Sequence, residues 1–111
     1  MPNVIFARPR WNYDSYSDLY KLIALSGYPL IYFDEIDPAS DNCYIMTMVN
    51  GENQNGWQGE PRARIILYDL EWRLDGEYPR IPGIAETWAA DPWYAAKVGA
   101  RYVTLGSHAG S

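Results

Sequence analysis

The stretch ARIILYDLEWRLDGEYPRIPGIAETWAADPWYAAKVGARYVTLGSH, residues 63–108, decides the fold class of this chain. Residues 65–68 form a short apolar run, which is typical of a strand covered on both faces in a parallel sheet. Residues 85–89 predict the next strand. Asp91 and Pro92 then predict the start of a helix, because Asp caps free amides and Pro is tolerated at the first helical position. Gly99 ends this helix, and residues 102–105 predict a further strand.

The first half of the chain continues the same alternation. The apolar residues of segment 14–26 have helical spacing, and Gly27 is suited to the position after a helix. The other apolar runs predict strands at residues 4–7, 30–33, 44–49 and 64–68. Helices and long links between strands favour parallel pairing, although the segment 44–49 follows a short turn and could pair antiparallel. We therefore predict a single domain over residues 1–111, a three-layer Rossmann-like α/β sandwich with a mostly parallel sheet of about six strands.

Composition narrows the class of protein. With 111 residues, 48% of them hydrophobic, the chain is long enough for one core, and 15% are aromatic, mainly Tyr and Trp. The net charge of −5 argues against binding to nucleic acid, which needs a basic surface. Cys43 is the single cysteine, so an intramolecular disulfide is excluded. We find neither a signal-peptide pattern nor an apolar run of membrane-spanning length, and we expect a soluble cytoplasmic domain.

The turn after the first strand carries candidate ligand-binding residues. It lacks the GxGxxG pattern, so dinucleotide binding in the usual manner is not expected and we predict no cofactor. Arg8 and Arg10 could instead hold a phosphate or a carboxylate, and Trp11 could supply a stacking face. The alternative is that the two arginines form ion pairs with Asp34 or Asp37 at the end of the next strand.

Acidic residues follow two of the predicted strands. Asp34 lies after the second strand, and Asp69 and Glu71 lie after the fourth. Carboxylates at the carboxyl edge of a sheet can act as general acid and base or bind a cation, so we assign Asp69 and Glu71 as candidate catalytic residues and Asp34 as ligand-binding. We predict no metal site. His108, in a Gly-Ser-His-Ala-Gly segment, is a candidate anion contact, although a solvated tail is the favoured explanation for a histidine near a chain terminus.

The second half of the chain resembles the N-terminal Rossmann-like half of two-domain (GT-B type) glycosyltransferase-like proteins of bacteria and phages. The resemblance rests on Tyr-Asp-Leu-Glu at 68–71, Glu-Thr-Trp at 86–88, the Asp-initiated helix 91–98 and Gly-Ala-Arg-Tyr-Val-Thr-Leu-Gly at 99–106. The family has Asn where this chain has Asp69. In such transferases a second domain binds the nucleotide-sugar donor. The resemblance therefore implies that this chain binds a ligand but does not catalyse a reaction alone. It implies that function needs a second domain, a partner subunit or another copy of the chain.

Two functional hypotheses follow. The first is a glycosyltransferase-like domain that binds a sugar, nucleotide or acceptor at the carboxyl edge of the sheet. The second is a non-catalytic phage or bacterial accessory protein that acts through protein–protein contacts or self-association. A cleft with convergent Asp, Glu and Arg side chains would favour the first hypothesis. Contiguous exposed surfaces of Trp57, Trp72 and Trp93 would favour the second.

Overall fold

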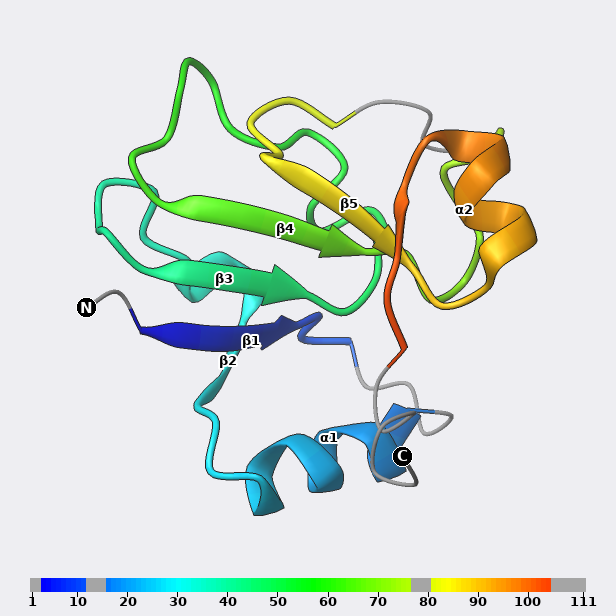
Figure 1. The fold of residues 1–111 in the computed structure, drawn as a ribbon. Helices are drawn as coiled ribbons and strands as arrows, with labels where there is room; N and C mark the ends of the chain where they lie inside the picture. The colour runs from blue at the N-terminus through cyan, green and yellow to red at the C-terminus, as the bar shows by residue number, and fades with distance from the viewer. Residues whose placement is uncertain (1–2, 12–15, 77–80, 105–111) are drawn as a thin grey trace.

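The computed structural model describes residues 3–11, 16–76 and 81–104 of the chain. A six-stranded sheet with the order β2-β1-β3-β4-β5-β6 forms its centre, and every pair of neighbouring strands is parallel (Figure 1). The strands are β1 (Val4–Arg8), β2 (Leu30–Tyr32), β3 (Cys43–Met46), β4 (Arg64–Tyr68), β5 (Glu86–Ala89) and β6 (Arg101–Tyr102). The helices are α1 (Ser17–Leu25), the 3-10 helix η2 (Phe33–Glu35) and α2 (Pro92–Val98). The predicted α/β fold with six strands is confirmed.

Strand β3 is parallel to both of its neighbours, β1 and β4, so the suggested antiparallel pairing of this segment is wrong. The reason is the order of the strands. Since β1 lies between β2 and β3, the link of residues 33–42 has to cross β1 and return in the same direction. Phe33 and Ile36 in this link are buried against the sheet, so the crossover contributes side chains to the core.

The side chains of β4 show how the two faces of the sheet are covered. Ile66 and Tyr68 pack in the cluster that includes Tyr20 and Ile23 of α1. Ile65 and Leu67 alternate with them and pack in the opposite cluster, beneath η2 and the loops. In β5, Trp88 packs on the α1 face, so the alternating Ala89, which contacts α2, faces the other way. With one helix on each face, the sheet is the middle of three layers.

Local signals in the sequence account for the helix ends. The Asp91 side chain accepts a hydrogen bond of 2.8 Å from the Tyr94 amide, and Gly99 ends α2 with a φ of 74°. Gly27, with a φ of 86°, follows the last residues of α1, as predicted. The first residue of α1 is Ser17, later than the predicted start at residue 14, which lies outside the described residues.

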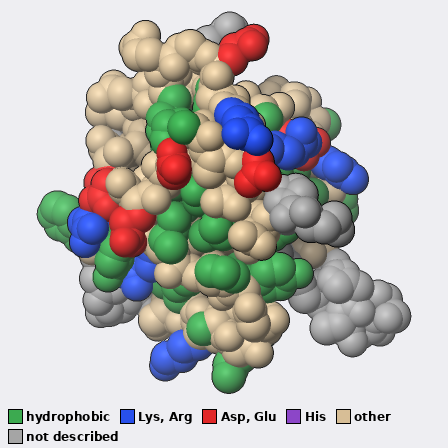
Figure 2. Space-filling view, turned by 90° about the vertical axis from the view of Figure 1, so that its left-hand side faces the viewer, with side chains coloured by type: hydrophobic (Ala, Val, Ile, Leu, Met, Phe, Trp, Pro, Cys, Tyr) green, Lys and Arg blue, Asp and Glu red, His purple; other side chains and the backbone are tan. Residues whose placement is uncertain are grey.

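The face at the amino ends of the strands carries acidic and basic side chains close together (Figure 2). Glu86, the first residue of β5, forms ion pairs with Arg64 of β4 at 3.3 Å and with Arg101 of β6 at 3.6 Å. Glu86 thus links β5 to the strands on both sides of it. No helix within the described residues is long and apolar enough to cross a membrane.

Candidate functional site

The carboxyl ends of β1 and β3 form the topological switch point of the sheet. From β1 the chain continues through α1 to β2 on one side, whereas β3 lies on the other side of β1. Loops leaving neighbouring strands in opposite directions open a crevice, which is where open α/β sheets bind their ligands. Strand β1 ends at this point with Arg8, so the predicted binding residues of the first turn lie at the switch point.

Arg8 lies among hydroxyl-bearing side chains. The carbon of its guanidinium is 4.6 Å from the ring centre of Tyr20 and 5.6 Å from that of Tyr32. The Tyr20 hydroxyl lies 3.2 Å from Oγ1 of Thr47, which follows β3. Burial raises the pKa of Tyr20, so its hydroxyl keeps its proton at neutral pH. The Arg8 guanidinium thus lies against the Tyr20 ring, and the buried hydroxyls of Tyr20 and Thr47 bond to each other beside the end of β3.

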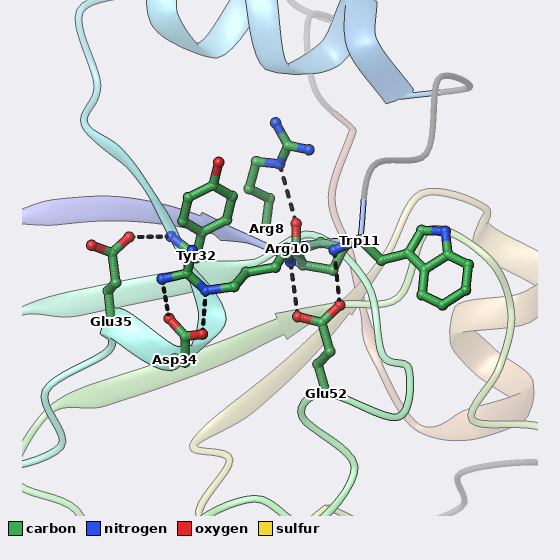
Figure 3. Close-up of polar contacts among 8 residues, drawn as sticks. Arg8, Arg10, Trp11, Tyr32, Asp34, Glu35 and Glu52 are labelled. Carbon is green, nitrogen blue, oxygen red and sulfur yellow. Dashed lines mark hydrogen bonds and ion pairs between the residues drawn. The ribbon is translucent and has the colours of Figure 1, made fainter.

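Arg10 binds Asp34, one of the two alternatives left open by the sequence (Figure 3). Its guanidinium donates from Nη2 to Oδ1 at 3.0 Å and from Nε to Oδ2, and it also lies 4.4 Å from the ring centre of Tyr32. The hydrogen bond from Arg10 lowers the pKa of the Asp34 carboxyl, and the same bond raises the pKa of Arg10. This exposed pair fixes the loop after β1 against η2.

Glu52 binds the backbone of the same loop (Figure 3). Its carboxylate accepts hydrogen bonds from the Arg10 amide at 2.8 Å and from the Trp11 amide at 3.1 Å. Consecutive amides that point at one anion are a common anion-binding arrangement. Buried Asn53 and Asn50 hold the Glu52 segment through side-chain bonds to the backbone. The loop after β1 is therefore preorganised, with a carboxylate of this chain on its amides.

Asp69 has a different environment from the other predicted site residues. Its side chain is fully buried. It accepts hydrogen bonds from the Tyr94 hydroxyl at 2.5 Å, the Arg73 amide at 3.0 Å and the Leu74 amide at 3.1 Å. This arrangement favours a structural role for Asp69, which closes the turn after β4 and ties it to α2.

Glu71 has separate partners, so the alternation along 69–71 does not bring the two carboxylates to one ligand. Glu71 forms an ion pair of 3.3 Å with Arg73, and both side chains are partly exposed. Burial and the neighbouring Glu71 carboxylate raise the pKa of Tyr16 to about 12. Tyr20 on α1 also senses the Glu71 charge. Glu71 therefore lies on the α1 side of the carboxyl edge, partly exposed and bound to Arg73 and Tyr16.

The remaining predicted residues are Trp11 and His108. The Trp11 indole is 70% exposed and points away from Arg8 and Arg10 (Figure 3). His108 lies outside the described residues. Among the described residues, no three His, Cys, Asp or Glu side chains are grouped closely enough to hold a metal ion. The structure thus brings together Arg8, Arg10 and Asp34 around Tyr32, with Glu71 nearer α1 and Asp69 apart.

Charged side chains contribute to the walls of a groove and of a smaller crevice. A groove of about 850 Å³ runs between α2 and the residues before β5, and its polar side chains are Asp75, Glu86, Thr87, Lys97 and Arg101. None of the predicted site residues that the structure describes lines this groove. A crevice of about 190 Å³ lies at the carboxyl edge between η2 and residues 52–57, and Asp34 and Trp57 line it. Asp34 is therefore the predicted ligand-binding residue that lines this crevice, whereas Arg8 and Arg10 lie outside its lining.

Several residues of the site were not found from the sequence. Tyr20 fits the apolar stripe of a helix, Tyr32 ends a strand, and Thr47 was expected inside one. Glu52 belongs to a polar loop and has no signal of its own. Their shared role appears only when the strand order brings the ends of β1, β2 and β3 together.

Comparison with protein-family models, with curated proteins and with solved structures finds no match to this chain.

Proposed function

We propose that this chain is a glycosyltransferase-like domain that binds the phosphate-bearing part of a sugar phosphate or nucleotide sugar at the carboxyl ends of β1 and β3. The observation that carries the proposal is the position of Arg8, which ends β1 at the switch point of an all-parallel sheet. This is where the loops of open α/β sheets receive ligands.

The groups around Arg8 suit an anionic ligand rich in oxygen. A guanidinium can donate two parallel hydrogen bonds to a phosphate. The hydroxyls of Tyr20 and Thr47 are buried and lie 3.2 Å apart, and Thr47 donates to the Ala7 carbonyl, so they order the end of β3 and the Tyr20 ring behind Arg8. The Tyr20 ring, 4.6 Å from the Arg8 guanidinium, supports the cation with its face. Arg10 contributes less, because Asp34 already balances its charge.

Of the two predicted catalytic carboxylates, Glu71 is the better candidate. It is partly exposed beside Tyr16, whereas Asp69 is buried with three donors. A carboxylate acting as general base has to reach an acceptor hydroxyl. We propose that this chain binds without turnover, and that a second domain or a partner subunit supplies the remaining groups for catalysis.

A thermal-shift screen tests the proposal. The probes are UDP-glucose, GDP-mannose, ADP-glucose and inorganic phosphate, each with and without manganese. We expect at least one nucleotide sugar to raise the melting temperature, and Arg8→Gln to remove that rise. Lys21→Gln, which removes the same charge from the exposed side of α1, should keep it. The proposal would be refuted if no probe changed the melting temperature, or if the melting temperatures of both variants responded equally to the probes.

One observation favours the second hypothesis, an accessory protein that self-associates. Trp72 and Trp93 are both exposed, and their ring centres lie 5.8 Å apart. Trp57 is not part of this surface, because it packs against the core. Sedimentation of the wild type and of Trp93→Ala over a range of concentrations tests this hypothesis. A dimer that the substitution dissociates would support it.

A further inference from the structure

Two tryptophans form an exposed aromatic surface beside the carboxyl end of β5. Trp72 follows β4 and is 46% exposed, and Trp93 in the first turn of α2 is 62% exposed. Their ring centres are 5.8 Å apart and the planes differ by 35°. We name these two residues the indole platform. Large apolar side chains in contact with each other and with solvent indicate a binding surface when the structure fixes their positions.

The structure fixes Trp72 strongly. Its φ of 58° is in the left-handed region, which is a true outlier for a bulky side chain. The Trp72 ring stacks on Tyr94, with centres 4.7 Å apart and planes 8° from parallel. Tyr94 is itself buried and held through its hydroxyl by Asp69. The same Asp69 carboxylate binds the amides of Arg73 and Leu74, which directly follow Trp72.

A backbone outlier of this kind persists only where surrounding contacts determine it. Here the contacts are made by the Asp69 carboxylate, the Tyr94 side chain and the backbone amides of Arg73 and Leu74. Together they hold one half-exposed indole next to a second. The arrangement is that of a preorganised contact surface.

The charges around the indole platform are already balanced. Lys97 lies 5.1 Å from the ring centre of Trp93 and forms an ion pair of 2.7 Å with Asp75. Arg73 forms an ion pair with Glu71. Together with the net charge of −5, this disfavours a polyanion such as a nucleic acid. An uncharged ligand fits the platform better.

The size of the platform indicates a small ligand. Two partly exposed indoles offer roughly 300 Å² of surface, given the area that aromatic side chains bury. A standard protein–protein interface needs about 800 Å² on each partner. A ring with an apolar face and polar edges would cover the indoles while its edges meet Lys97 and Asp75. A pyranose ring has that form, with C–H groups on its faces and hydroxyls around its rim.

We propose that the indole platform binds a sugar ring of a neutral oligosaccharide. This site involves α2 and the turn after β4, and the proposal does not depend on phosphate binding at Arg8. Stacking on the two indoles supplies the apolar contact, and the Lys97–Asp75 pair offers a donor and an acceptor for ring hydroxyls.

The test follows the indole N–H signals of the 15N-labelled protein during titration with cellohexaose, maltohexaose, mannohexaose and chitohexaose. The chain has five tryptophans, so the signals can be assigned with single Trp→Phe variants. We expect at least one hexasaccharide to shift the signals of Trp72 and Trp93. Trp93→Ala should weaken its binding at least about tenfold, because roughly 100 Å² of apolar surface is lost from the contact. Trp93→Tyr should restore most of the affinity.

The controls separate this proposal from the one at Arg8. Trp11→Ala removes an even more exposed indole from the loop after β1 and should leave hexasaccharide binding unchanged. Arg8→Gln should also leave it unchanged, and Trp93→Ala should leave the response to nucleotide sugars unchanged. The proposal is overturned if no hexasaccharide moves the two indole signals, if Trp93→Ala binds like the wild type, or if Trp93→Ala instead dissociates a dimer.

Discussion

The Tyr94 hydroxyl donates a hydrogen bond of 2.5 Å to Oδ2 of Asp69, and both side chains are buried. The bond joins the turn after β4 to helix α2, two parts of the chain that are 25 residues apart. It also orients the ring on which Trp72 stacks. Through this bond Asp69 holds helix α2 against the end of the sheet.

Removing either partner of this bond should destabilise the fold. Tyr94→Phe keeps the ring but removes the donor, so we expect the free energy of unfolding to fall by about 1–3 kcal/mol. Asp69→Ala removes the acceptor of one buried donor and two partly buried ones, and should cost at least about 3 kcal/mol. Urea unfolding followed by circular dichroism measures both. Tyr102→Phe, at an exposed tyrosine, is the control and should change stability by less than about 0.5 kcal/mol. Equal stability of Tyr94→Phe and this control would contradict the structural role of Asp69.

Tyr94, which is buried, and Tyr16, which is partly buried, predict a loss of stability at alkaline pH. Burial, followed by the hydrogen bond to Asp69 and the charge of that residue, raises the pKa of Tyr94, and burial beside Glu71 raises that of Tyr16 to about 12. An unfolded tyrosine has a pKa of about 10. Above pH 10 the unfolded chain releases protons that the folded state retains, so stability is complete below pH 10 and falls as the pH rises through the folded-state values.

Urea unfolding at pH 8, 9, 10 and 11 measures this loss, and absorbance at 295 nm reports tyrosine ionisation. Tyr94→Phe should flatten the decrease above pH 10, whereas Tyr102→Phe should not. A wild-type curve with no decrease up to pH 11 would contradict the burial of these hydroxyls.

The Arg10–Asp34 pair predicts a shifted titration at an exposed site. The hydrogen bond from Arg10 holds the pKa of the Asp34 carboxyl below its usual range. Arg10→Gln should therefore raise this pKa, which NMR titration of the Asp34 carboxyl carbon can follow. The pair stabilises the fold fully at a pH above the ordinary pKa of an aspartate carboxyl. This stabilisation is lost as the pH falls through the lowered pKa of Asp34. Because both side chains are exposed, the effect on unfolding should be small. An unchanged Asp34 pKa in Arg10→Gln would show that the pair does not persist in solution.

Two glycines of one loop give a matched pair of substitutions. Gly56 has a φ of 58°, and a Cβ at this position would lie 2.0 Å from the carbonyl oxygen of Pro82. Gly59 has a φ of 72°, but a Cβ there would meet nothing within 4 Å. Both alanine variants should lose about 1 kcal/mol to the left-handed backbone. Gly56→Ala should lose at least about 2 kcal/mol more, because the loop has to move away from Pro82. Equal midpoints in urea for the two variants would contradict this close approach of the loop to residues 81–84.

The elements that the sequence predicted well depend on local signals. The apolar run at 65–68 indicated a covered strand, and Asp91, Pro92 and Gly99 marked the ends of α2 within a few residues. The direction of β3 was left open because it depends on which strand lies between β2 and β3, and that order is a property of the whole sheet. The short link between β2 and β3 is compatible with an antiparallel hairpin as long as the position of β1 between them is unknown.

The candidate site was predicted only in part, for the same physical reason. The pairing of Arg10 with Asp34 was among the alternatives, since both residues follow neighbouring parallel strands. Glu52 binds the amide of Arg10, which lies 42 residues earlier in the chain. No local pattern in the sequence indicates this contact. Likewise, a carboxylate after a strand gives no sign of whether it faces solvent. In Asp69 the decisive partner, Tyr94, comes from a helix much later in the chain.

The left-handed backbone at Trp72 has a consequence for how this surface can change during evolution. Glycine or asparagine would relieve the torsional cost at position 72 at once, because both adopt positive φ readily. Drift without selection would therefore favour these two small residues. An aromatic ring that persists at this position across divergent homologues would be a record of selection for the exposed indole itself.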